Sequence, residues 1–474
     1  MAAGGTFLTP SVNLESPMRS WIAFSVLALG ACAAETSSPA VPGRLEVVMG
    51  ADQVGAPARG LDTMIVIKLT DDRGAPISGA AITWTVKGGG GQLEGAATTT
   101  GPDGLATARW ILGNLPGPQQ LQVLANGVDP LEIVADARGL RALAVAVSGH
   151  AVCAIDTTHV TRCWGNLDEF DFYPDLDYGD TPVIVDSTLR FVSIAGGASH
   201  FCALTGTGAA WCWGYTNSGQ LGTGAGAVGS LYPQQVAGGH SFAKITANSR
   251  ITCALTPAGQ AWCWGTPGDG SLGTGNVTDL VPAAVQQGGS SYTSISLGYS
   301  HLCALDSNAE AWCWGHGDVG QLGDSFESDR NVPTKVAGGQ QYTTITAGDH
   351  FTCATGLDRS VWCWGVPPLF PYRNDDVPAA IGSASVTQLI GDDEYMVGIR
   401  AGRPVIAGSA SYIGIPPELG GGNLTEMPGG LFAVDRIAFR WATICMIRAD
   451  DQLFCAGDVP GYGLTATPIG IPLP

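Results

Sequence analysis

Twelve of the thirteen cysteines form six pairs, and the two members of every pair are ten residues apart. In the clearest copy, Cys202-Ala203-Leu204 is followed by a short turn and then by Trp211-Cys212-Trp213-Gly214. The motif returns at 253–265, 303–315 and 353–365, and in weaker form at 153–165 and 445–457. A repeat of about 50 residues predicts an array of similar units that bury their faces against one another.

The spacing within each pair predicts a disulfide inside a β-hairpin. Ten residues across a turn place the two cysteines opposite each other on paired strands. The alternative is zinc, which needs four ligands and usually takes them from close-spaced motifs such as Cys-x-x-Cys. Each hairpin offers two cysteines and no regular histidine, so disulfides and an oxidising compartment are favoured. The expected pairs are Cys153–Cys163, Cys202–Cys212, Cys253–Cys263, Cys303–Cys313, Cys353–Cys363 and Cys445–Cys455.

Composition narrows both the fold and the function. The chain has 68 glycines and 29 prolines, and it shows no long apolar stripe of helical period, so an all-β fold is expected. A net charge of −19 argues against nucleic acid or an anionic membrane surface as a partner. No nucleophile elbow, phosphate loop or zinc-protease motif occurs. The sequence therefore predicts no catalytic residue and no cofactor.

Residues 1–31 are expected to be an export signal. Met18-Arg19-Ser20 provides a charged start, 21–29 an apolar core, and Leu29-Gly30-Ala31 leads to Cys32. This pattern resembles the bacterial lipoprotein signal, which implies lipidation of Cys32 and a place in the outer membrane, if the cell has one. An ordinary secretory signal is the alternative. Met18 is the better start, so residues 1–17 are expected to be an extension, and 32–43 a flexible tether.

Residues 44–138 show the alternation of short strands. Apolar residues alternate in 65–69, 81–86 and 106–112, with turn residues between these runs. This pattern predicts a small β-sandwich. The run Asp71 to Pro76, with Trp84 and Trp110, resembles bacterial Ig-like domains of the invasin and intimin type. The resemblance implies a spacer or adhesive stalk.

Residues 139–474 divide into seven units, of which six carry cysteines. Each unit ends in a proline-led strand, and the unit without cysteines is expected to hold Met396 and Ile406 in their places. The pattern Gly-x-Ser-His-x-Cys-Ala-Leu, Trp-x-Trp-Gly, Gly-Gln-Leu-Gly and Pro-x-x-Val resembles the regulator-of-chromosome-condensation repeat. That resemblance implies a seven-bladed β-propeller with strands A to D in each blade. The nucleotide-exchange activity known in that family is not expected in an exported chain.

The loops between strands C and D vary most, so they are the expected binding face. Several are acidic, which predicts a partner contact that is basic or cation-bridged and weakened by salt. The candidate contact residues are Asp168, Glu169, Phe170, Asp171, Phe172, Asp318, Glu327 and Asp375. Carboxylates at alternate positions could also hold Ca²⁺, although a solvated acidic loop is favoured over such a site. That cation loop would comprise Asp168, Asp171, Asp175 and Asp177.

The sequence thus predicts a non-enzymatic binding protein, lipid-anchored in the bacterial envelope or on the cell surface. Its partner would be a protein, or a surface glycan, on the C–D face, and its only membrane contact would be the lipid anchor. Two alternatives stay open. One is an enzyme acting on a glycan or small molecule in the central opening, and the other is a purely structural or adhesive surface protein. The histidines His150, His200, His301 and His350 recur near strand-B cysteines, which favours a structural role over catalysis.

Overall fold

The computed structural model describes residues 41–167, 176–226, 229–266, 271–276, 278–286, 291–367, 375–383, 386–392, 395–408, 424–427, 431, 433–440, 442–460 and 463–471. The predicted signal at 1–31, Cys32 and most of the tether at 32–43 lie outside these residues. The described residues form strands and turns with no α-helix, as expected for an all-β chain. None of them belongs to a helix long and apolar enough to cross a bilayer.

The first eight strands form two four-stranded sheets, ordered β1-β3-β6-β5 and β2-β8-β7-β4. Both sheets contribute to one core, in which Ile65, Ile67, Trp110, Leu121 and Val123 are fully buried. The alternation read from the sequence is clearest in β3, β6, β7 and β8, where every second residue along most of the strand is buried. The Ig-like type of this sandwich stays a prediction. The strands are β1 (Pro42–Met49), β2 (Gln53–Gly55), β3 (Ile65–Asp71), β4 (Ile82–Gly88), β5 (Gln92–Glu94), β6 (Leu105–Ile111), β7 (Gly117–Ala125) and β8 (Leu131–Ala137).

Seven further sheets follow, each built from four strands that are consecutive in the chain and antiparallel. We number them sheets 1 to 7 and call their strands A to D in chain order. The first four are β9 (Ala142–Ser148), β10 (His150–Asp156), β11 (Thr161–Asn166), β12 (Val183–Asp186); β13 (Phe191–Gly196), β14 (His200–Thr205), β15 (Ala210–Gly214), β16 (Ser230–Gln235); β17 (Lys244–Asn248), β18 (Ile251–Leu255), β19 (Ala261–Gly265), β20 (Asp279–Ala284); and β21 (Tyr292–Leu297), β22 (His301–Asp306), β23 (Ala311–Gly315), β24 (Arg330–Lys335). The last three are β25 (Tyr342–Ala347), β26 (Phe351–Gly356), β27 (Ser360–Gly365), β28 (Asp375–Ser383); β29 (Val386–Asp392), β30 (Tyr395–Arg400), β31 (Arg403–Gly408), β32 (Thr425–Glu426); and β33 (Val434–Arg440), β34 (Thr443–Arg448), β35 (Leu453–Val459), β36 (Gly463–Gly470).

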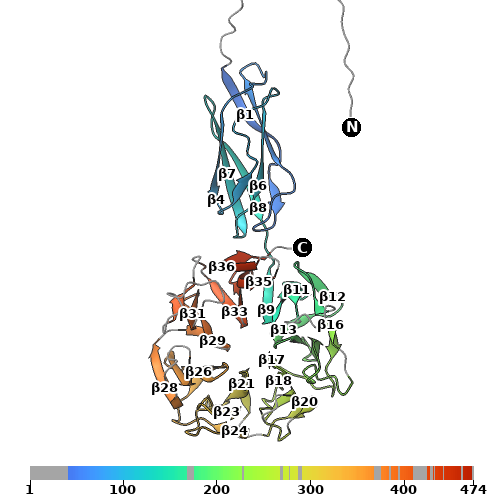
Figure 1. The fold of residues 1–474 in the computed structure, drawn as a ribbon, viewed down its shortest axis with the longest axis vertical. Helices are drawn as coiled ribbons and strands as arrows, with labels where there is room; N and C mark the ends of the chain where they lie inside the picture. Colours follow the sequence, from blue (N-terminus) through green and yellow to red (C-terminus); the bar gives the residue numbers. More distant parts are fainter. Residues whose placement is uncertain are drawn as a thin grey trace, which may run out of the picture. The chain divides into compact units, whose positions relative to one another are not determined.

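These sheets are arranged as a ring, with the A strands innermost. Each A strand contacts the A strand of the next sheet, and β33 of sheet 7 contacts β9 of sheet 1. The strands β12, β16, β20, β24 and β28 lie on the outside (Figure 1). Neighbouring sheets share apolar clusters. In one of them Cys202 and Cys212 of sheet 2 pack with Trp264 of sheet 3, and all three side chains are fully buried.

Sheet 7 closes the ring on sheet 1 without exchanging a strand. Leu140 N donates to Ile471 O (2.5 Å), Leu453 N donates to Leu140 O (2.9 Å), and Ala142 N donates to Asp451 O (2.7 Å). The two sheets share an apolar core, in which Trp164 of sheet 1 packs in one cluster with Cys445 and Cys455 of sheet 7. The two ends of the repeat region are thus joined by hydrogen bonds and apolar packing.

Sheet 6 departs from the sequence-based alignment by one residue. Its hairpin pairs Val397 with Ile406, where other sheets pair two cysteines, so the prediction of Met396 at that position was wrong. The reason is a tighter B–C turn, in which Arg400 directly opposes Arg403. Val397 and Ile406 are fully buried and pack against sheet 7, as the cysteines of other sheets pack against their next neighbour.

Candidate functional site

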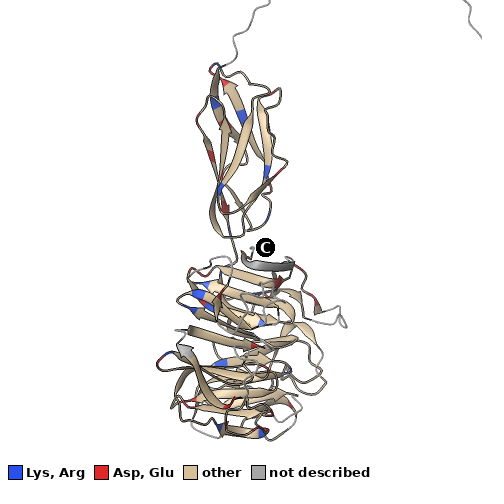
Figure 2. Ribbon diagram, turned by 60° about the vertical axis from the view of Figure 1, so that its left-hand side comes forward, with Lys and Arg blue, Asp and Glu red and all other residues tan. Residues whose placement is uncertain are grey.

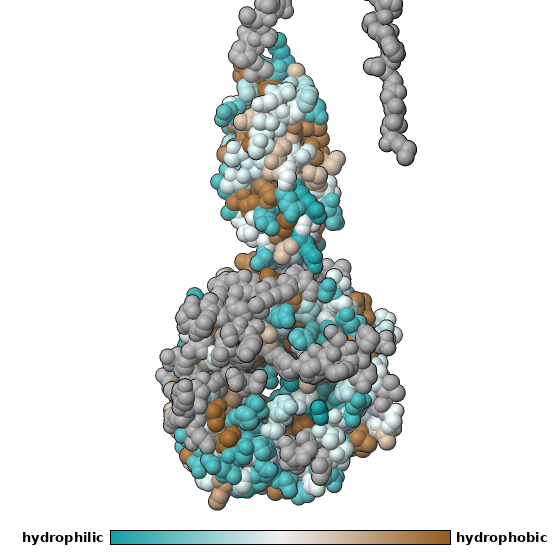
Figure 3. All heavy atoms as spheres, viewed as in Figure 1, coloured by the Kyte–Doolittle hydropathy of each residue, from teal (hydrophilic) through white to brown (hydrophobic). Residues whose placement is uncertain are grey.

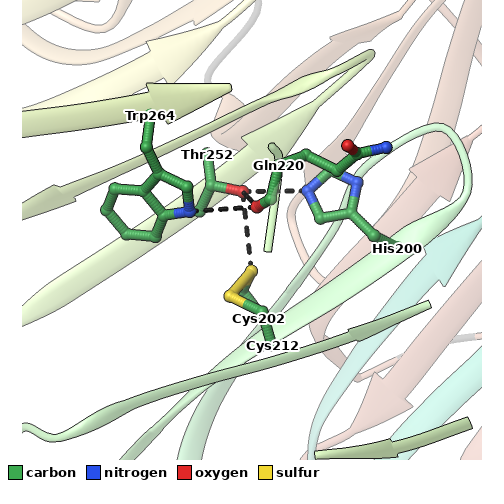
Figure 4. The surroundings of a disulfide bond; sticks show 6 residues. All are labelled: His200, Cys202, Cys212, Gln220, Thr252 and Trp264. Atoms are coloured by element: carbon green, nitrogen blue, oxygen red, sulfur yellow. Dashed lines mark hydrogen bonds between the residues drawn. A yellow bond between two sulfur atoms is a disulfide. The ribbon is translucent and has the colours of Figure 1, made fainter. Parts of the chain in front are cut away.

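The disulfides lie at the contacts between sheets, and each is surrounded by side chains from two neighbours. In the structure all six pairs are bonded, and their cysteines are at most 1% exposed. Around Cys202–Cys212, the Thr252 hydroxyl of sheet 3 donates to Gln220 O of sheet 2 (2.9 Å) and lies 3.5 Å from Cys202 Sγ (Figure 4). Trp264 Nε1 donates to the same carbonyl (2.9 Å). This network links sheets 2 and 3.

His200 completes the network and has a structural role in it, as a hydrogen-bond donor to the next sheet. Its Nε2 lies 2.9 Å from Thr252 Oγ1. Since that hydroxyl gives its one proton to Gln220 O, it must accept a hydrogen bond from His200 Nε2. His301, Thr352 and Gln321 repeat the arrangement between sheets 4 and 5, with distances of 2.8 Å for both bonds.

Both histidines are buried and neutral. Burial lowers the pKa of His200 to about 3, with a smaller effect from the Arg440 charge. Burial likewise lowers the pKa of His301 to about 3, with smaller effects from His350 and His316. The side chains of His150 and His350 are instead 43% and 56% exposed and lie near Asp458 and Asp349. The four histidines therefore do not share one environment, although the sequence places them at similar positions.

The Gly-Gln-Leu-Gly turn ends in a glycine because the next sheet leaves no room for a side chain there. Gly222 has φ of +66°, and a Cβ there would lie 2.7 Å from Trp264 Nε1. Gly323 has φ of +67° and meets Trp364 at the same distance. A side chain at either position would be strained and would also collide with the tryptophan, so the glycine allows adjacent sheets to approach closely.

Strand direction separates two faces of the ring. A–B and C–D connections emerge on one, which we call the C–D face, and B–C and D–A connections emerge on the other, which we call the B–C face. Arg141 precedes β9, so the chain enters the ring on the B–C face.

Charge divides unevenly between these faces. Figure 2 marks Lys and Arg in blue and Asp and Glu in red along the ribbon. The described basic residues on the C–D face are few, namely Arg250, Arg330 and Arg440. Its described acidic residues are Asp177, Asp180, Asp279, Asp318, Asp324, Glu327, Asp329, Asp349, Asp375, Asp376, Asp392 and Asp458. The B–C face carries both signs of charge in similar number. Its described basic residues are Arg141, Arg162, Arg190, Lys244, Lys335, Arg359, Arg400, Arg403, Arg436 and Arg448, and its described acidic residues are Asp156, Asp186, Asp306, Glu310, Asp358, Glu426, Asp435, Asp450 and Asp451.

The loop at 316–329 of sheet 4 holds four of the acidic residues of the C–D face, Asp318, Asp324, Glu327 and Asp329. His316 lies between two carboxylates, 3.1 Å from Asp318 and 3.0 Å from Asp329. Its backbone N–H donates to Ser300 O (2.9 Å), which ties this loop to the A–B connection that carries Tyr299. We call Tyr299, His316, Asp318, Phe326, Glu327 and Asp329 the sheet 4 surface.

The structure brings some of the predicted contact residues together. Asp318 and Glu327 lie in the sheet 4 loop, and Ser325 N of that loop donates to Asp376 O (3.0 Å), beside Asp375 of sheet 5. The prediction missed Tyr299, Phe326 and His316, because a single aromatic or histidine in a loop carries no periodic signal. The predicted residues Asp168, Glu169, Phe170, Asp171 and Phe172 lie outside the described residues.

The predicted cation loop is mostly outside the described residues as well, since Asp168, Asp171 and Asp175 are not among them. Asp177 is exposed, and its carboxylate accepts a hydrogen bond from Gly179 N (2.8 Å). Across the part of the chain that the structure describes, no three His, Cys, Asp or Glu side chains are grouped so that they could hold a metal ion.

A buried polar group lies near the axis of the ring. Arg440 of sheet 7 donates to Asn248 Oδ1 of sheet 3 and lies 3.7 Å from Asp392 of sheet 6. The side chains of Arg440 and Asp392 are 6% and 10% exposed. Asn248 Nδ2 donates in turn to Leu297 O of sheet 4 (2.9 Å). The contact of Arg440 with Asn248 connects sheets 7 and 3, which are not neighbours, whereas the other two contacts join neighbouring sheets.

Two family models match within the ring. Residues 191–220 and 292–321 match one model of the regulator of chromosome condensation (RCC1) repeat, and residues 207–255 and 308–355 match another. The chain is 33% identical over 126 residues to the Arabidopsis thaliana ultraviolet-B receptor UVR8, covering 26% of this chain and 28% of the receptor. It is 29% identical over 171 residues to the human E3 ubiquitin-protein ligase HERC2, covering 34% of this chain and 3% of the ligase. The chain thus matches a minor part of both relatives.

Solved structures give the fold. Human WBSCR16 aligns with a TM-score of 0.56 at 18% identity, covering 62% of this chain and 85% of that one. Yeast RCC1 (Prp20), solved with Kap60 bound, aligns with a TM-score of 0.54 at 17% identity, covering 66% of this chain and 82% of that one. The chain therefore carries regulator of chromosome condensation repeats and resembles the propellers built from them.

Proposed function

We propose that this chain is a non-enzymatic protein-binding propeller, exported and lipid-anchored in the bacterial envelope. Sheets 1 to 7 would be the seven blades of one propeller at 139–474, and residues 44–138 would be an Ig-like spacer. Cys32 would carry the lipid. The observation that carries the proposal is the acidic C–D face, which lies opposite the end where the chain enters the ring.

The architecture supports display of that face. The proposed anchor and spacer precede Arg141, so they connect to the B–C face and leave the C–D connections free of the chain's own attachment. Six buried disulfides fit an oxidising compartment. Yeast RCC1, whose structure aligns with this ring, was solved with the protein Kap60 bound to it, so a chain with this fold can have a protein partner.

The enzyme alternative requires polar groups that converge on a substrate in the central opening. Near the axis, the polar side chains of Arg440, Asn248 and Asp392 are buried, and Arg440 contacts the other two. They have the character of a structural cluster, which favours the binding function.

Two experiments test the proposal. Cys32→Ser should abolish lipid labelling and shift the protein from the membrane fraction to a soluble one, and unchanged labelling and fractionation would refute the anchor. Affinity capture from envelope extracts with the intact chain should then retain a defined protein. Elution by salt is expected, since exposed charge contacts are screened by ions. Capture of no protein at any ionic strength would refute the binding function.

A further inference from the structure

Two exposed aromatic side chains distinguish the sheet 4 surface from the rest of that sheet. Phe326 and Tyr299 are each 61% exposed, whereas Tyr292 and Trp314 of the same sheet are at most 2% exposed. On the face that Figure 3 draws, the coloured apolar residues lie in separate patches among hydrophilic ones. Burying a phenylalanine ring in a contact removes a large apolar surface from water, which stabilises the complex. Phe326 is therefore suited to act as a contact anchor.

The loop holds Phe326 in place before any partner arrives. Asp324 Oδ1 accepts a hydrogen bond from Phe326 N (3.2 Å), and its Oδ2 accepts one from Arg330 Nε (2.7 Å). The Arg330 guanidinium lies 5.2 Å from the centre of the Phe326 ring. The Asp324 side chain is 3% exposed, so the loop buries an ion pair and leaves the aromatic ring outside. An anchor fixed in this way loses little conformational entropy on binding.

The charges in the same loop as Phe326 select the partner. Asp318 and Asp329 are 57% and 49% exposed at their side chains, and Glu327 is exposed beside Phe326. The one arginine of the loop region, Arg330, is already paired with Asp324. Exposed carboxylates in the same loop as an exposed aromatic ring match a partner that offers Lys or Arg together with apolar side chains.

We infer that the sheet 4 surface binds a cationic protein segment, in which Lys or Arg residues accompany apolar ones, with Phe326 as its anchor. This inference rests on the proposed function and specifies its partner class. Nucleic acid and anionic lipid surfaces would be repelled by the same carboxylates. A glycan could stack on the aromatic rings, but it would gain little from the carboxylates, so it is an outcome for the test to exclude.

The first test is photo-cross-linking in the full-length protein in cells. A photo-cross-linking amino acid replaces Phe326 and, as a matched control, Leu357, which is also 61% exposed but lies in a B–C turn. We expect position 326 to cross-link to a protein segment rich in Lys or Arg, and position 357 not to reach that segment. Attachment to lipid, glycan or an acidic segment, or no cross-link at 326, would overturn the inference.

The second test uses defined peptides with the purified chain. A ten-residue peptide of alternating Lys and Leu should bind, and those of alternating Glu and Leu or Lys and Gly should bind much more weakly. Phe326→Ala should weaken binding roughly tenfold, whereas Leu357→Ala should leave it unchanged. Equal binding by Phe326→Ala and wild type would overturn the inference. If Phe326→Ala still captures the same envelope protein as wild type, the inference fails while the proposed function stands.

Discussion

Two buried histidines couple the stability of the ring to pH. Burial lowers the pKa of both His200 and His301 to about 3, whereas histidines in an unfolded chain titrate near 6.5. Below pH 6.5 the unfolded state binds protons that the folded state does not, so the stability present above pH 6.5 is lost as the pH falls toward 3. Each histidine contributes a slope of about 1.4 kcal/mol per pH unit in that window.

Urea unfolding between pH 7 and pH 5 checks this prediction. The double variant His200→Gln/His301→Gln should show a flatter dependence of the unfolding free energy on pH than the wild type. That range avoids most carboxylate titration. Equal slopes for the two proteins would contradict the assignment of neutral, buried imidazoles.

The axial arginine is expected to matter more than any surface arginine. Arg440→Met removes the guanidinium that contacts Asn248 and Asp392 in a buried site, and losing one member of such a cluster should cost about 3 kcal/mol. The control is Arg403→Met, since the side chains of Arg403 and Glu426 are 54% and 49% exposed. Breaking that exposed pair should cost less than about 1 kcal/mol. Chemical unfolding at pH 7 compares the two, and equal losses would sink the prediction.

At the level of the strand pair, sheet 6 shows what a disulfide position needs. Val397 and Ile406 are directly opposite, as Cys353 and Cys363 are in sheet 5. The double variant Val397→Cys/Ile406→Cys should therefore form a seventh disulfide, worth about 2.5 kcal/mol in the chain-entropy account. In the comparison variant Met396→Cys/Ile406→Cys the two positions are not opposite. Non-reducing peptide mapping should find a bridge in the first variant and free thiols in the second, and the reverse would refute the register.

The sequence predicted the hairpins well because their signal is local. Cys202 opposes Cys212 in the register, as its spacing across a turn implied. Counting from a motif was wrong only in sheet 6, where the tighter turn at Arg400–Arg403 shifts the partner of Ile406 by one residue. The axial contact of Arg440 with Asn248 could not be predicted, because it joins residues 192 positions apart whose approach depends on the assembled ring. Phe326 was missed for a similar reason, since its exposure depends on a loop that buries Asp324 instead.

For the whole molecule, the division of charge makes a prediction about binding. Reversing two carboxylates of the C–D face, Asp318→Lys/Glu327→Lys, should weaken capture of the envelope partner at least about tenfold and reduce its dependence on salt. Asp358→Lys is the control and should have no effect, because Asp358 lies on an exposed B–C turn and its carboxylate accepts a backbone hydrogen bond only within that turn, from Ser360 N (3.0 Å). Binding titrations at two salt concentrations measure the affinity of each variant for the partner. Equal losses of affinity in the double variant and in the Asp358→Lys control would place the contact elsewhere.

Asp306 is not a suitable control, although it also lies on the B–C face. It is 2% exposed, and its carboxylate accepts hydrogen bonds from Asn308 N (2.9 Å), Glu310 N (2.9 Å) and Trp312 Nε1 (3.3 Å). Reversing its charge would disturb the turn itself, so a loss of binding would not report on the face.

The short span of each disulfide has a consequence for how the protein is made. Every bonded pair lies within one hairpin, so a cysteine meets its partner as soon as the next ten residues have left the ribosome or the translocation channel. Oxidation can thus proceed sheet by sheet in the order of synthesis, with no need to reshuffle distant thiols. Closure is different, because Leu140 must wait for Leu453 and Ile471. An arrested chain that lacks its last sheet could oxidise the cysteine pairs of its other sheets and yet leave the flank of sheet 1 exposed, which makes it a ready substrate for chaperones and proteases.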